Sequence, residues 1–149
     1  MKEDGLRMWR HCLLSGMAFL LATAAPASAF IAYVSNEKGN TVTVIDTDNW
    51  TVTKTIKVGQ RPRGIEFTRD GKFVFVAVGD DDSIQVIDVA KQEVVDTLPS
   101  GPDPELFALD ADGKILYVAN ENDNTVTIID VEKRSRLGEI QVGVEPEGM

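Results

Sequence analysis

The chain beyond residue 29 consists of short apolar runs with a period of two, separated by turn residues. Residues 73–78 (FVFVAV) are apolar on both faces, which is typical of a strand buried between packed sheets. Residues 83–88 alternate in part, and residues 93–98 are more polar, as we expect for an outer strand. Residues 106–109 open the next sheet after a break rich in Pro and Gly. This part of the sequence shows no helical period, so we predict an all-β fold.

The same pattern returns every 42 residues without insertion or deletion. Several residue types recur at equivalent positions of three copies: Val34, Val76, Val118; Ile45, Ile87, Ile129; Asp46, Asp88, Asp130; Gly59, Gly101, Gly143; and Pro62, Pro104, Pro146. Four strands in about 40–45 residues is the unit of a β-propeller blade. A β-solenoid is the alternative, although its repeats are usually shorter. We therefore predict a β-propeller of four-stranded antiparallel blades.

The repeats divide residues 30–149 into about three blades. They cover residues 30–61, 62–103 and 104–145, and residues 146–149 begin a further blade. Closed propellers have about four to eight blades. We therefore expect this segment to be part of a ring of about seven blades, or several copies to assemble into one ring.

Residues 1–29 are predicted to be a signal peptide. A short basic head precedes an apolar run over residues 13–22, and Ala27 and Ala29 have the small-residue spacing of a signal-peptidase site. Cleavage before Phe30 would export the chain, and we expect a periplasmic location. The apolar run is too short to cross about 30 Å of hydrocarbon comfortably, so we expect no membrane span after cleavage. Both the first and the eighth residue are Met, and either could start translation.

The leader contains the only His and the only Cys, His11 and Cys12. Residues 30–149 therefore lack the side chains for a Cys or His nucleophile, a c-type haem attachment or a Cys/His zinc site. The whole sequence has 15 basic and 24 acidic residues, of which the predicted signal peptide contains three basic and two acidic ones. Residues 30–149 therefore have 12 basic and 22 acidic residues, a net charge of −10. With no basic stripe to neutralise phosphates, nucleic acid is not an expected partner.

Three segments resemble the Tyr-Val-Thr-Asn signature of the YVTN β-propeller family. They are residues 33–36 (YVSN), 75–78 (FVAV) and 117–120 (YVAN), and the middle one departs from the signature at its first and last positions. Residues 41–46 (TVTVID) and 112–114 (DGK) extend the likeness.

A narrower resemblance is to the PQQ-dependent catabolism-associated β-propeller proteins. It rests on residues 30–40, 59–64, 101–107 and 142–149. This resemblance implies a bacterial periplasmic setting, beside quinoprotein alcohol dehydrogenases and an ABC transporter. PQQ is implied for the pathway only, and we expect no bound cofactor.

The loops that enter the innermost strand of each blade are unusually charged. They carry Arg61, Arg63, Asp103, Glu105, Glu145 and Glu147, which the 42-residue spacing places around the channel mouth. In a propeller these loops share one face with the hairpins between second and third strands. We expect this rim to bind a polar ligand, a metal or a partner loop. The alternative is a solvated rim, where each exposed ion pair contributes at most about 1 kcal/mol.

A run of three carboxylates, Asp80, Asp81 and Asp82, lies on the same face and is a weak candidate for calcium. Turns also attract Asp, so we predict no metal site here.

We therefore expect a non-catalytic periplasmic protein that serves PQQ-dependent alcohol catabolism by binding a periplasmic protein or a small polar ligand. A quinoprotein dehydrogenase and a component of the ABC transporter are the candidate partners. One alternative is a propeller enzyme, quinoprotein-like or lactonase-like. The other is a structural repeat protein of the cell surface.

Overall fold

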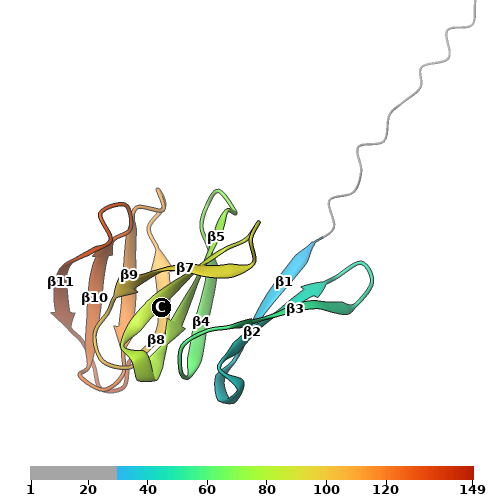
Figure 1. The fold of residues 1–149 in the computed structure, drawn as a ribbon. Coiled ribbons are helices and arrows are strands. Elements are labelled where there is room, and N and C mark those ends of the chain that lie inside the picture. Colours follow the sequence, from blue (N-terminus) through green and yellow to red (C-terminus); the bar gives the residue numbers. More distant parts are fainter. Residues whose placement is uncertain (1–29) are drawn as a thin grey trace, which may run out of the picture.

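A computed structural model describes residues 30–149 and contains three antiparallel sheets in this range (Figure 1). The first sheet has three strands: β1 (Ile31–Asn36), β2 (Thr41–Asp46) and β3 (Thr51–Lys57). The second has four: β4 (Pro62–Phe67), β5 (Phe73–Val78), β6 (Ser83–Asp88) and β7 (Glu93–Pro99). The third also has four: β8 (Pro104–Leu109), β9 (Ile115–Asn120), β10 (Thr125–Asp130) and β11 (Ser135–Gln141).

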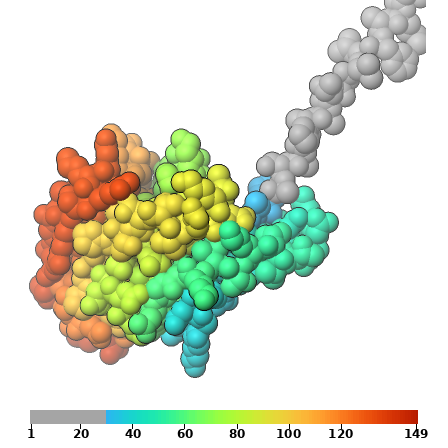
Figure 2. Space-filling view, viewed as in Figure 1, coloured from blue at the N-terminus to red at the C-terminus, as the bar shows by residue number. Residues whose placement is uncertain are grey.

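Each sheet is one blade of a propeller, which confirms the predicted all-β class and the four-stranded repeat. Within a blade the strands are hydrogen-bonded in chain order, with β4 and β8 at the inner edge. β8 begins at Pro104, two residues before the predicted start, because Pro is tolerated as the first residue of a strand. A register shift follows that Pro in both β4 and β8. The blades follow one another across the molecule in chain order (Figure 2).

The aspartates repeated every 42 positions stabilise hairpin turns. Asp46 and Asp88 each accept two backbone N–H groups of the following hairpin, and Asp130 accepts one. The pKa of all three carboxyls is lowered, mainly by the side-chain hydrogen bond of Asn49 to Asp46 and of Lys133 to Asp130, and by the backbone N–H of Lys91 at Asp88. A tight turn at residues 112–113 connects β8 to β9, with Gly113 at φ 71°. The recurring aspartates are therefore turn caps of their own blades.

In the first and third blades, the Asn that ends β1 or β9 donates side-chain hydrogen bonds to the next strand of the same blade. Asn36 Nδ2 donates to the hydroxyls of Thr41 and Thr43 at 3.1 and 2.8 Å. Asn120 makes the equivalent bonds to Thr125 and Thr127 at 3.0 and 2.8 Å. In the middle blade Val78 replaces the Asn, and Ser83 and Gln85 replace the two Thr residues. In these three blades the Asn is therefore present only where both Thr residues are present. This pairing gives a physical reason for the final Asn of the repeated tetrapeptide.

The apolar core lies between the blades. One cluster joins Val42, Val44 and Ile56 of the first blade to Val74, Val76, Val78 and Ile87 of the second. The other joins Ile84 and Leu98 of the second blade to Leu116, Val118 and Ile129 of the third. β5 is apolar on both faces because it takes part in both clusters, and burial of such surface contributes roughly 25 cal/mol per Å².

The inner strands approach one another closely. A Cβ on Gly64 of β4 would lie 2.6 Å from the carbonyl oxygen of Glu105 in β8, so only Gly fits there. The loops that precede these two strands are thereby held side by side. Within the described range, no helix has the length and apolar character needed to cross a bilayer.

Candidate functional site

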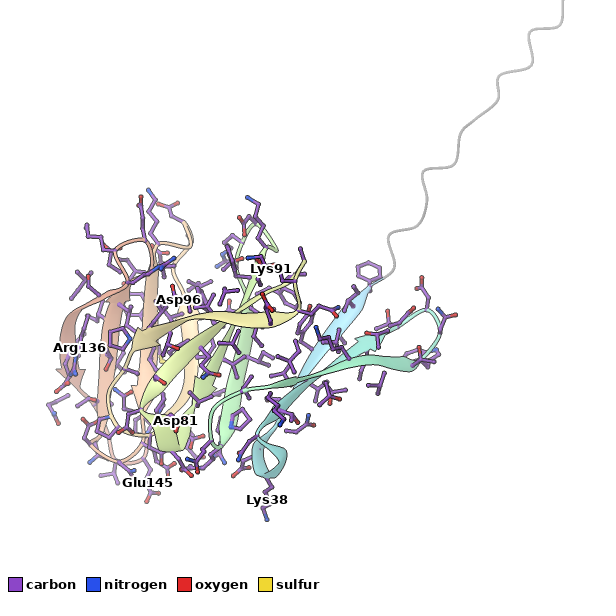
Figure 3. All side chains as sticks on the ribbon, in the orientation of Figure 1. Lys38, Asp81, Lys91, Asp96, Arg136 and Glu145 are labelled. Atoms are coloured by element: carbon purple, nitrogen blue, oxygen red, sulfur yellow. The ribbon has the colours of Figure 1, made fainter. Side chains whose placement is uncertain are left out.

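The loops that enter the inner strands share one end of the blades with the hairpins between second and third strands. Those hairpins contain the short 3₁₀ turns η1 (Glu37–Gly39) and η2 (Gly79–Asp81). Lys38, Asp81 and Glu145 all lie at this end, whereas Lys91 of the β6–β7 hairpin lies at the other (Figure 3). This arrangement is the one that we predicted for the charged loops.

A repeated hydrogen bond fixes the backbone of each entering loop. Arg61, Asp103 and Glu145 occupy the left-handed region, with φ between 52° and 55°. The backbone N–H of each donates to a side-chain oxygen of the preceding hairpin, at 2.9 to 3.0 Å. The acceptors are Asn40, Asp82 and Asn124, which are themselves left-handed. The loop backbone is thus held by a hairpin while its own side chain stays free to face the rim.

Arg61 lies at the centre of the site. Its Nη1 donates to both carboxylate oxygens of Asp103, at 2.7 and 2.8 Å, and its Nη2 donates to Glu105 at 2.6 Å. Glu121 lies 3.4 Å from Nη2, and Asp80 lies 3.6 Å from Nη1. The hydrogen bond to Asp103 is the main cause that raises the pKa of Arg61. Arg61 therefore links its own loop to the third blade.

Arg63 completes the contacts of Glu105. Its Nε lies 2.5 Å from Glu105 Oε2, and its Nη1 lies 3.1 Å from Glu37. Only 3% of Glu105 is exposed, and this burial raises the pKa of its carboxyl against the opposing effect of Arg63. A buried carboxylate held by two guanidinium groups is unusual for a solvated rim.

We call these seven side chains the rim cluster: Glu37, Arg61, Arg63, Asp80, Asp103, Glu105 and Glu121. Four of the six predicted rim residues belong to it. Glu147 is outside the cluster but lines a hollow of about 390 Å³ together with Glu37, Arg63, Glu105, Ser35, Pro62 and Leu106. Glu145 is exposed, and its backbone N–H is bound by Asn124.

Sequence reasoning did not include Glu37 and Glu121 in the site, and it named Asp80 only within a weak calcium candidate on the same face. Glu37 and Glu121 are equivalent residues, 84 positions apart, and each directly follows the Asn that ends a second strand. That equivalence is the signal that could have identified them. Asp80 has no acidic equivalent, since Lys38 and Asn122 stand at its position in the other blades.

The three consecutive aspartates each face a different partner. Asp80 lies near Arg61, Asp81 accepts the backbone N–H of Gln60 at 2.8 Å, and Asp82 accepts that of Asp103. In the described part of the chain, the carboxylates grouped closely enough for a cation are Asp103, Glu105 and Glu121. Arg61 already lies against all three of these carboxylates.

Antiparallel four-stranded sheets that pack face to face, one after another along the chain, define a β-propeller. The chain belongs to the family described as "Lactonase, 7-bladed beta-propeller", whose family model matches residues 23–146. No curated protein matches the sequence.

Solved propeller structures resemble the fold of this chain. Hydrazine synthase of Kuenenia stuttgartiensis is 26% identical with a TM-score of 0.74, over 78% of this chain and 34% of its own. The dihydro-heme d1 dehydrogenase NirN, solved with DHE, is 22% identical with a TM-score of 0.64, over 74% and 24%. Apo AztD of Citrobacter koseri is 18% identical with a TM-score of 0.60, over 72% and 30%. The chain thus spans about a third or less of the proteins it matches.

Proposed function

We propose that this chain is a non-catalytic binding unit whose channel mouth takes up a small polar ligand or a charged loop of a partner protein. The observation that supports this is the buried Glu105, held by Arg61 and Arg63 beside the open hollow of about 390 Å³. Pockets that bind small molecules commonly combine a few fixed polar groups with a preformed hollow.

The charge of the rim cluster favours a cationic ligand. Five carboxylates surround two guanidinium groups, so negative charge is in excess at the mouth. Glu37 of this cluster and Glu147, which lies outside it, are exposed carboxylates in the wall of the hollow. We therefore infer that the ligand presents an ammonium or guanidinium group, as a lysine or arginine of a partner would.

The biological setting of the proposal is periplasmic oxidation of alcohols by quinoproteins. It is supported by the predicted signal peptide and by the YVTN-type and PQQ-associated segments of the sequence. A quinoprotein dehydrogenase or a component of an ABC transporter is the partner that we propose. PQQ belongs to the pathway in this proposal, and no residue of this chain is assigned to it.

Gene deletion in the source organism tests this function. We expect deletion to slow growth on primary alcohols and to leave growth on an organic acid unchanged. Complementation with Glu37→Gln combined with Glu147→Gln should fail on alcohols, because both exposed carboxylates of the hollow lose their charge. Asp48→Asn, at an exposed turn of the β2–β3 hairpin, is the matched control and should restore growth. Unimpaired growth of the deletion strain on alcohols would exclude the proposed pathway.

A lactonase-like enzyme is the second candidate, because the matching family is described as a lactonase family. Glu105 is the candidate general base of such an enzyme, because burial raises the pKa of its carboxyl. We expect the purified chain to hydrolyse a simple γ-lactone no faster than buffer does, as followed by acid release. Hydrolysis that is present in the wild type and lost in Glu105→Gln would establish the enzyme instead.

A further inference from the structure

A small apolar cavity lies at the interface between the second and third blades. Its volume is about 210 Å³, and its apolar lining is Phe73, Phe75, Val86, Val95, Leu98 and Val131. Three of these residues, Phe75, Val86 and Leu98, belong to the buried core between the two blades. An apolar cavity of about 150 Å³ is large enough to bind benzene. This cavity therefore has room for an apolar group the size of a single ring.

One ion pair stands at the exposed side of the cavity. Arg134, in the hairpin between β10 and β11, lies 2.7 Å from a carboxylate oxygen of Asp96 on β7 (Figure 3). The register of β6 and β7 shifts here, and both Val95 and Asp96 line the cavity. The hydroxyl of Thr68, the other polar lining residue, is hydrogen-bonded within its own turn. Polar recognition in the cavity therefore depends on the ion pair.

An ion pair offers a ligand both kinds of hydrogen-bonding group. The carboxylate of Asp96 accepts hydrogen bonds, and the guanidinium of Arg134 donates them. A hydroxyl group can donate and accept at once, and each of its bonds to this pair is charge-assisted. A carboxylate would be repelled by Asp96, and an ammonium group by Arg134. The pair therefore favours an uncharged hydroxyl over either charged group.

The equivalent interface between the first and second blades does not have this pair. Lys54 and Gln92 stand at the positions of Asp96 and Arg134. Lys54 donates instead to the carbonyl oxygen of Lys91, at 3.5 Å. The ion pair is thus a property of the second interface and not of the repeat.

We propose that this cavity binds a small uncharged molecule with a ring-sized apolar body and one hydroxyl group. The body packs against Phe75 and Leu98 at the floor of the cavity. The hydroxyl donates to Asp96 and accepts from Arg134. None of these residues belongs to the rim cluster, and the proposal is independent of what the rim binds.

Four ligands that share one ring test the proposal: benzyl alcohol, toluene, benzoate and benzylamine. Binding to the purified product of the full-length gene is measured by NMR chemical-shift titration at neutral pH. We expect benzyl alcohol to bind at least about tenfold more tightly than each of the others, which corresponds to about 1.4 kcal/mol. Equal binding of toluene would mean that the ion pair does not recognise the hydroxyl, and tighter binding of a charged ligand would mean that it selects charge. Either result, or no binding of benzyl alcohol, would overturn the proposal.

Replacement of one member of the ion pair should change the preferred ligand. Asp96→Asn leaves the charge of Arg134, so benzoate should become the tightest ligand. Arg134→Met leaves the charge of Asp96, so benzylamine should become the tightest. If the pair acted on folding alone, both variants would weaken all four ligands in parallel, and that result would contradict the proposed contacts.

Filling the cavity should prevent binding. Val95 is 41% exposed, so Val95→Phe can add a ring at the cavity without displacing the core, and the affinity for benzyl alcohol should fall at least about tenfold. Thr53 occupies the equivalent place at the register shift of the first blade. Thr53→Phe is therefore the matched control and should bind as the wild type does. Unchanged binding by Val95→Phe would place the ligand elsewhere and refute the site.

Discussion

The two ends of the blades use their charged residues in different ways. At the rim, Arg61 contacts carboxylates 42, 44 and 60 residues further along the chain. At the opposite end, Asp46, Asp88 and Asp130 bind groups two or three residues away. The rim therefore joins blades through a partly buried network of charges. At the other end the repeated aspartates close the hairpins of single blades, and the contacts between blades, from Lys54, Arg69 and Arg134, are long or exposed to solvent.

Replacement of Arg61 should show the largest difference between the two ends. Arg61→Ala leaves the buried Asp103 without its guanidinium partner and removes one of the two that hold Glu105, and we expect a loss of about 3 kcal/mol in the free energy of unfolding. Urea denaturation at fixed protein concentration measures it. Arg134→Ala is the control. Its ion pair with Asp96 is at 2.7 Å but more exposed, so its loss should be at most about 1 kcal/mol. Equal losses would contradict the distinction between the two ends.

The pH dependence of stability should have opposite signs at the two ends. The pKa of Glu105 is raised in the folded state, so its contribution to stability falls as the pH rises above the usual value of about 4.3. The pKa of Asp88 is lowered, so its contribution is present above about pH 3.9 and is lost as the pH falls through its folded value.

Two variants separate these contributions. Relative to the wild type, Glu105→Gln should gain stability as the pH rises from about 4 to 7. The stability deficit of Asp88→Asn should shrink as the pH falls below about 3.9, the usual pKa of an Asp carboxyl. Parallel curves for the two variants would show that both carboxyls titrate alike.

Removal of a hairpin cap should have the smallest effect. Asp88→Ala removes two bonds to backbone N–H groups at an exposed turn, and we expect a loss of stability well below that of Arg61→Ala. Thermal unfolding measures the change. Asp48→Ala, in the equivalent hairpin of the first blade, is the control, because the side chain of Asp48 is exposed. A loss as large as that of Arg61→Ala would mean that this cap also supports contacts between blades.

The sequence was sufficient to predict the fold of the blade and most residues of the rim. The period of two and the 42-residue spacing predicted the strands, and the spacing alone placed Arg61, Arg63, Asp103 and Glu105 on one face. It could not predict that Arg61 reaches Glu121 or that Glu105 is buried. Those features depend on how closely β4 and β8 approach each other at Gly64. The pattern of residue types along the chain gives no information about that distance.

Three positions with the same backbone carry different charges at the rim. Arg61, Asp103 and Glu145 share one left-handed conformation, and a hairpin side chain holds the N–H of each. The side chain of the loop residue takes no part in that bond. The charge of this side chain can therefore change sign while the loop keeps its conformation. A duplicated blade therefore inherits the loop shape intact, and point mutation alone can rewrite the charge pattern of the mouth. Ligand preference in this architecture can evolve one blade at a time.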